Sequence, residues 1–174
     1  DVGSLVGSTV TLDLAQNATC TIANDDQAAH LIIIKAVVNN NGGTKTAGDF
    51  SGTVSGVTVA GGNTWTGTVT PGVNKTLTTV GSYGVTETAD ADYDTTYSAD
   101  CTGTIALGET KTCTVTNNDK AAHLIVIKHV INANGGTAVA GAFPISVTAT
   151  NPNPANFAGV EDPGTDVALE AGAY

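Results

Sequence analysis

Short stretches in which apolar and polar residues alternate run along most of the chain. In Gly81–Glu87 the larger side chains occupy every second position, and small or hydroxyl residues lie between them; Cys113–Asn117 alternates in the same way. A period of two places alternate side chains on one face of a β-strand. Turn-forming pairs such as Pro71-Gly72 separate the stretches. The pattern therefore predicts an all-β chain.

About seven short strands joined by turns are predicted for the middle of the chain, which is the pattern of an Ig-like β-sandwich. They cover Leu31–Val38, Phe50–Ala60, Trp65–Thr70, Thr76–Val80, Gly81–Glu87, Tyr97–Cys101 and Ile105–Asn117. The first of these strands is apolar on both faces, so the pattern alone leaves open which face is buried. An acidic loop is expected at Ala89–Asp94.

A long repeat divides the chain into modules. The segment Cys113–Lys128 repeats Cys20–Lys35 at a constant offset of 93 residues, and a period of this length indicates tandem units. We expect residues 1–29 to form the closing strands of one module plus a linker. Residues 30–122 form a complete module, and residues 123–174 form an incomplete one. Its Phe143, Phe157 and Tyr174 match Phe50, Trp65 and Tyr83 of the complete module.

Composition and charge exclude several functions. The 174 residues include 21 Gly and no Met, and the formal net charge is −10. A surface this acidic argues against binding to nucleic acid and to an anionic membrane. No apolar run approaches the roughly 20 residues of a membrane-spanning helix, so we expect no membrane insertion in this segment. No nucleophile–base pair, metal-ligand spacing or phosphate-binding loop is found, so we expect no enzyme, no cofactor and no metal.

The cysteines and two asparagines are candidates for covalent modification. Cys101 and Cys113 lie across one predicted hairpin, which suits a disulfide and implies an oxidising, extracytoplasmic location; two buried free thiols are the alternative. Cys20 matches Cys113, but Ser8 occupies the position expected for its partner. Asn17 and Asn74 begin glycosylation sequons.

Three pieces of the sequence, in this order and spacing, carry a family resemblance. They are an opening strand that ends in lysine (Ile32–Lys35), the strand Gly81–Glu87, and a closing strand that ends in asparagine (Thr114–Asn117). Together they resemble the SpaA/CnaB-type, prealbumin-like β-sandwich modules of microbial pilins and surface-adhesin stalks. The resemblance covers most of residues 30–122 and half of residues 123–174.

The resemblance implies a self-made crosslink. In this family the opening lysine and the closing asparagine form an intramolecular isopeptide bond, assisted by an acidic residue. Carried over, Lys35 would bond to Asn117, with Glu87 as the proton shuttle; burial would favour the neutral, nucleophilic amine. In the alternative, Lys35 is an edge-strand lysine that reaches solvent, Glu87 is a solvated acid and Asn117 is a turn former.

The favoured function is a structural one. We expect an extracellular subunit of a filament, pilus or surface stalk at the cell surface, whose partners are copies of itself. Residues 1–24 of one copy would complete the incomplete sandwich of the next copy by strand addition. The alternative is an adhesin stalk or binding module of a longer tandem-repeat surface protein, with a host or cell-surface ligand. A non-catalytic spacer of a secreted enzyme is a third hypothesis.

Overall fold

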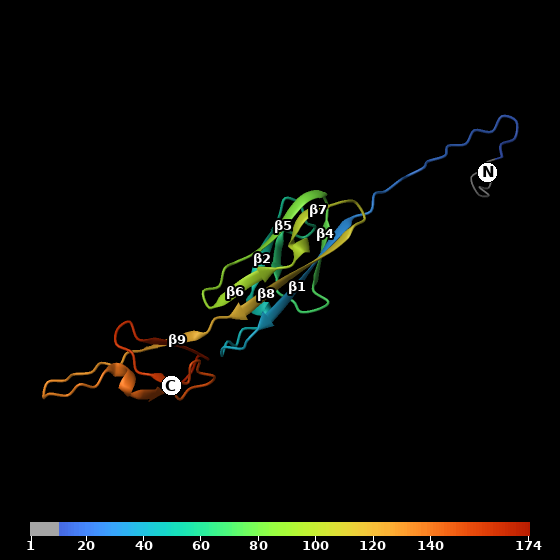
Figure 1. Cartoon of the computed structure of the whole chain (residues 1–174). Coiled ribbons are helices and arrows are strands. Elements are labelled where there is room, and N and C mark those ends of the chain that lie inside the picture. The colour runs from blue at the N-terminus through green and yellow to red at the C-terminus, as the bar shows by residue number, and fades with distance from the viewer. Residues whose placement is uncertain (1–10) are drawn as a thin grey trace.

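The computed structural model describes residues 11–174, and nearly all of its regular structure is β-strand (Figure 1). The exceptions are three short 3-10 helices, η1 (Ala47–Asp49), η2 (Ala99–Cys101) and η3 (Ala140–Ala142). Within these residues no helix is long and apolar enough to cross a lipid bilayer. The prediction of an all-β chain is confirmed.

Residues 29–119, which we call the complete module, fold into a sandwich of two four-stranded sheets. One sheet has the order β4 (Val73–Leu77), β1 (Ala29–Val38), β8 (Thr110–Asp119), β6 (Tyr93–Tyr97). The other has the order β3 (Thr64–Thr66), β2 (Ser51–Ser55), β5 (Gly81–Glu87), β7 (Thr102–Ile105). Leu31 and Val115 from the first sheet form one apolar cluster with Val54, Trp65 and Val85 from the second, so the core lies between the sheets.

Strand β1 is a central strand of its sheet. It pairs in antiparallel fashion with β4 and in parallel with β8, from His30 opposite Thr110 to Val38 opposite Asn118. The face that carries Leu31, Ile33 and Lys35 is buried in the sandwich. The structure thereby decides the orientation that the sequence pattern left open.

Of the predicted strands, Gly81–Glu87 has the observed bounds and the others differ from them. The strand expected at Tyr97–Cys101 is wrong: β6 ends at Tyr97, and Cys101 ends the 3-10 helix η2. Tyr93, expected in an acidic loop, instead begins β6. It pairs with Asp119 of β8, and its side chain is buried. Strand β2 ends at Ser55 because Gly56, with φ of 81°, turns the chain.

Residues 122–174, which we call the incomplete module, repeat only part of this architecture. Strand β9 (Ala122–Val126) pairs with β12 (Thr165–Leu169) as β1 pairs with β4. Strands β10 (Pro144–Ser146) and β11 (Asn156–Ala158) form a second two-stranded sheet. The turn that precedes β12 repeats the turn that precedes β4. A Cβ added to Gly164 would lie 2.7 Å from the Val126 carbonyl oxygen, and a Cβ added to Gly72 would lie 2.6 Å from the Ile33 carbonyl oxygen.

Residues 11–28, which we call the front segment, form no strand in this chain. All of them are exposed, and Figure 1 shows the segment running away from the sandwich. The closing strands expected within residues 1–29 are therefore not formed in residues 11–28, and residues 1–10 lie outside the described residues. A strand gains hydrogen bonds and burial only against a sheet, and this segment lies against none.

Candidate functional site: a buried lysine, asparagine and glutamate

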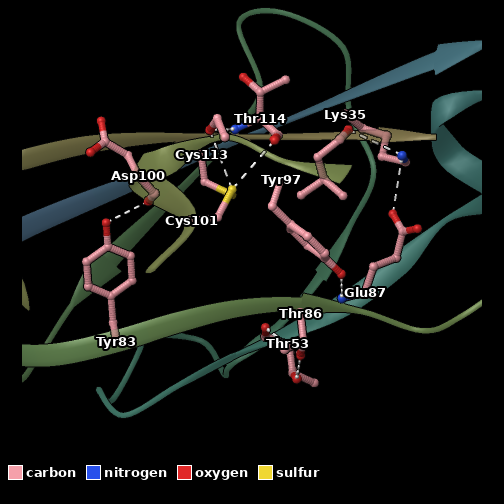
Figure 2. The surroundings of a disulfide bond; sticks show 12 residues. Lys35, Thr53, Tyr83, Thr86, Glu87, Tyr97, Asp100, Cys101, Cys113 and Thr114 are labelled. Carbon is pink, nitrogen blue, oxygen red and sulfur yellow. Dashed lines mark hydrogen bonds and ion pairs between the residues drawn. A yellow bond between two sulfur atoms is a disulfide. The ribbon is translucent and has the colours of Figure 1, made fainter. Parts of the chain in front are cut away.

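Lys35, Asn117 and Glu87 meet inside the complete module. The Lys35 Nζ donates a hydrogen bond to the Asn117 Oδ1 at 2.6 Å and lies 3.3 Å from the Glu87 Oε2. The Lys35 and Glu87 side chains are 0% and 1% exposed, and Asn117 is fully buried. The structure thus brings together the three residues that the sequence singled out, and Figure 2 shows the Lys35–Glu87 pair.

Three different strands position these side chains. Lys35 on β1 pairs with Val115 of β8, and Asn117, two residues further along β8, pairs with Val37. The Lys35 and Asn117 side chains therefore enter the same part of the core. Glu87 is the last residue of β5, which belongs to the opposite sheet. A crosslink between Lys35 and Asn117 would therefore join the first and last strands of the complete module within one sheet.

Small and aromatic residues shape the space around the lysine. The Lys35 Nζ lies 4.5 Å from the centre of the Phe50 ring. A Cβ added to Gly67 would lie 2.9 Å from the Lys35 Cγ, so only glycine leaves room for the lysine stem. The Thr95 hydroxyl donates to the Glu87 Oε1 at 3.1 Å, which fixes the carboxylate.

Burial controls the charge state of the lysine. Desolvation lowers the pKa of Lys35, and the attraction of the Glu87 carboxylate offsets part of this effect. A lower pKa increases the neutral fraction of the amine, which is the nucleophilic form. In the part of the chain that the structure describes, the Asn117 Nδ2 is buried without a hydrogen-bond partner.

A disulfide lies next to this site in the same sandwich (Figure 2). It joins Cys101 to Cys113, which are 12 residues apart in sequence, and both residues are buried. The Tyr83 hydroxyl donates to the Asp100 carbonyl at 2.6 Å, which holds the loop that carries Cys101. The disulfide therefore ties the η2 turn to the closing strand β8.

A family model of a prealbumin-like fold domain of the SpaA type matches residues 26–118 and, a second time, residues 119–174. The chain belongs to this family. No curated protein and no solved structure matches the chain significantly. The match agrees with the resemblance described from the sequence, and prealbumin-like domains of this type are typical of pilins and surface stalks and are generally structural.

The second prealbumin-like domain carries the lysine half of the same arrangement. Lys128 lies at the position of Lys35, and its Nζ is 4.5 Å from the centre of the Phe143 ring. A Cβ added to Gly159 would lie 2.7 Å from the Lys128 Cγ, as at Gly67 in the complete module. Lys128 is half-buried, and no closing strand lies beside it among the described residues.

The remaining candidates are on the surface. Asn17 and Asn74 are exposed, so both sequons are accessible to modification, although the Asn74 Oδ1 also lies 3.1 Å from the His30 Nδ1. Cys20 is a free, exposed cysteine. Ser8, at the position expected for its partner, lies outside the described residues.

Sequence reasoning missed one buried acid, Asp119, which is 5% exposed. Its carboxylate accepts hydrogen bonds from the backbone N–H groups of Asn40, Asn41 and Gly43. A signal was present, because Asp26 occupies the same position in the repeat. The repeat showed that the position recurs, but not that its carboxylate binds a loop.

Proposed function

We propose that the chain is a structural subunit of an extracellular filament, pilus or surface stalk, assembled head-to-tail by strand complementation. One observation carries the proposal. Among the described strands, β9 pairs only with β12, whereas its counterpart β1 lies between β4 and β8. The front segment repeats the sequence of β8 and is exposed. The open edge and an exposed segment that matches the closing strand in sequence are thus both present on one chain.

The open edge of β9 is costly in isolation. Ile125 in β9 and Ile127, which follows the strand, are 52% and 51% exposed. An unpaired strand edge beside apolar side chains readily takes up another strand. The register of β1 with β8, moved by the repeat offset, places Cys20 opposite Val126 and Asn24 opposite Val130. Because the donor and acceptor are different surfaces, the contact does not close on itself and produces a fibre.

We further propose that the complete module is locked by an isopeptide bond between Lys35 and Asn117. The neutral Lys35 Nζ attacks the Asn117 Cγ, the new N–Cγ bond forms, and the Cγ–Nδ2 bond breaks. Glu87 accepts the proton from the amine and delivers one to the leaving nitrogen, which departs as ammonia. The 2.6 Å contact between Lys35 and Asn117 and the adjacent Glu87 support this step. Such a bond would resist pulling along the stalk.

Intact mass spectrometry of the denatured protein, with its disulfide reduced, tests the crosslink. We expect the wild type to weigh one ammonia less than its sequence, and we expect Lys35→Arg and Glu87→Gln to have the full mass. Lys128→Arg is the matched control and should keep the wild-type deficit. A wild-type protein of full mass would overturn the crosslink while leaving the assembly proposal standing.

Sedimentation over a range of protein concentrations, followed by electron microscopy, tests the assembly. We expect filaments whose length increases with concentration. Proline cannot donate a hydrogen bond to a β-ladder, so Ala18→Pro combined with Ile22→Pro should abolish them. The control, Ala18→Val with Ile22→Val, retains every N–H group and should assemble. A wild-type chain that stays monomeric at all concentrations would overturn the proposal.

A stalk made of one longer chain is the second candidate, and the two consecutive family matches favour it. In that case residues of the same polypeptide would close the β9 edge. Dilution separates the two candidates, because a complemented filament dissociates into subunits of this chain and a covalent stalk keeps its length.

A further inference from the structure

The complete module contains a carboxylate-binding loop. The Asp119 carboxylate, at the end of β8, accepts hydrogen bonds from the backbone N–H groups of Asn40 at 2.9 Å, Asn41 at 2.8 Å and Gly43 at 2.7 Å. The Asn41 side-chain amide adds a bond to the Asp119 carbonyl at 2.7 Å. Successive N–H groups that converge on one point form an anion site. The aspartate therefore fastens the end of the closing strand to the loop that follows the opening strand.

The incomplete module has the same loop without the aspartate. Asn132 donates from its Nδ2 to the Ala138 carbonyl at 2.9 Å, as Asn39 does to the Lys45 carbonyl at 2.9 Å. The glycines adopt the same left-handed conformation, with φ of 92° at Gly42 and 86° at its counterpart Gly135. The loop is thus shaped before any carboxylate binds.

The space that Asp119 occupies in the complete module is open in the incomplete one. A Cβ added to Gly43 would lie 2.4 Å from the Tyr93 hydroxyl and 2.8 Å from the Asp119 Oδ2. At the matching Gly136, the atoms within reach belong to Asn132 of the same loop. Residues 132–136 are all exposed, whereas Asn41 and Gly43 are half-buried.

The front segment carries an acidic residue, Asp26, at the repeat position of Asp119. Asn24-Asp25-Asp26 repeats Asn117-Asn118-Asp119 at the offset of 93 residues, and all three front residues are exposed. In the register inherited from β1 and β8, Asp25 pairs opposite Ile131. Asp26 then follows at the mouth of the loop, where Asp119 lies in the complete module.

We propose that residues 132–136 are a docking loop for the Asp26 carboxylate of a second copy of this chain. This proposal rests on the proposed strand complementation and names the contact that fixes its register. A slip of one residue would bring Asp25 to the loop and turn the apolar side chains of the donor strand to the wrong face. Each copy has a net charge of −10, so copies repel one another at long range, and this loop supplies a local site for an acidic residue.

Association constants measured by sedimentation at physiological salt test the proposal. Hydrogen bonds to a charged group contribute enough that Asp26→Asn should weaken assembly by at least about tenfold. Asp25→Asn removes the same charge from the adjacent position, and we expect it to change assembly by less than about twofold. Because both aspartates are exposed in the single chain, neither variant should affect folding.

A charge placed in the loop gives an independent test. Asn134 corresponds to Asn41, so Asn134→Asp would oppose Asp26 and should weaken assembly at least as much as Asp26→Asn. Combining the two substitutions should weaken assembly by less than the product of the single effects, because the repulsion is gone. If wild type assembles and Asp26→Asn assembles equally tightly, the docking loop is wrong and complementation stands. If wild type never assembles, both proposals fall.

Discussion

The complete and incomplete modules begin with nearly the same strand but bury it to different extents. Leu31 and Ile33 are 0% and 1% exposed, whereas their counterparts Leu124 and Val126 are half-buried. Strands β5 and β8 cover the first pair, and no described strand takes these places over the second. Full burial of an aliphatic side chain contributes about 1.5–3 kcal/mol. The presence of a closing strand therefore decides how much the burial of the opening strand stabilises each module.

The two lysines give the sharpest form of this comparison. Lys35→Ala leaves the Glu87 carboxylate buried without its partner, and breaking such a buried pair costs about 3–5 kcal/mol. Lys128→Ala removes one partly exposed contact with the Phe143 ring, worth about 0.5–1 kcal/mol. Hydrogen exchange of the amides in β1 and β9 measures both local stabilities in one experiment.

The assembled state should narrow this difference between the lysines. Once a closing strand covers β9, the repeat register places Asn24 beside Lys128 as Asn117 lies beside Lys35. Lys128→Ala should then destabilise β9 by about 1.5–3 kcal/mol more than it does in the dilute chain, because it also removes a hydrogen bond of the charged amine. Equal losses for the two variants in the dilute chain would contradict the comparison, because they would mean that β9 is already covered.

The disulfide is a second difference between the two modules, because it lies in the complete module, and we expect its loss to cost somewhat less stability than the loss of Lys35. Replacing both Cys101 and Cys113 with alanine releases a loop of 12 residues, which should lower the free energy of unfolding by about 3 kcal/mol. Trp65 is the single tryptophan of the chain and is buried in the complete module, so its fluorescence in a urea titration reports that module alone. Cys20→Ala is the control and should leave the curve unchanged.

Residue parity and repetition predicted much of this molecule. Alternation placed Glu87 and Asn117 on the same faces as Tyr83 and Val115, and the structure buries all four side chains. The repeat offset located the second module and its lysine. These signals are visible in sequence because strand periodicity and duplicated units are properties of the chain itself.

The rest depended on contacts between distant segments. The direction of Lys35 was undetermined because both faces of β1 are apolar, and only packing against the opposite sheet buries one of them. The loop held by Asp119 lies 76 or more residues away in sequence. Tyr93 was expected in a loop because acidic neighbours surround it, yet its ring packs 5.3 Å from that of Phe50. Tertiary contacts overrode the local pattern in each case.

The buried Asp119 carboxylate makes the stability of the complete module depend on pH. Burial alone would raise the pKa of Asp119, but hydrogen bonds from the backbone N–H groups of Gly43, Asn40 and Asn41 outweigh burial and hold the pKa below its ordinary value of 3.8. A carboxyl whose pKa is lowered on folding stabilises the native state above its unfolded pKa. That contribution is lost as the pH falls through the folded pKa.

We expect Asp119→Asn to lower the unfolding free energy of the complete module by about 1.5–3 kcal/mol at neutral pH, because its hydrogen bonds are charge-assisted. The difference from wild type should shrink as the pH falls from about 4 through the lowered folded pKa, where the wild-type carboxyl becomes protonated as well. Urea titrations followed by Trp65 fluorescence at several pH values measure it. Asp26→Asn, at the exposed counterpart of Asp119, is the matched control and should leave the stability of the complete module unchanged. If the difference in unfolding free energy between wild type and Asp119→Asn stays constant down to pH about 2, the prediction is wrong. Packing, and not the carboxylate charge, would then hold the loop.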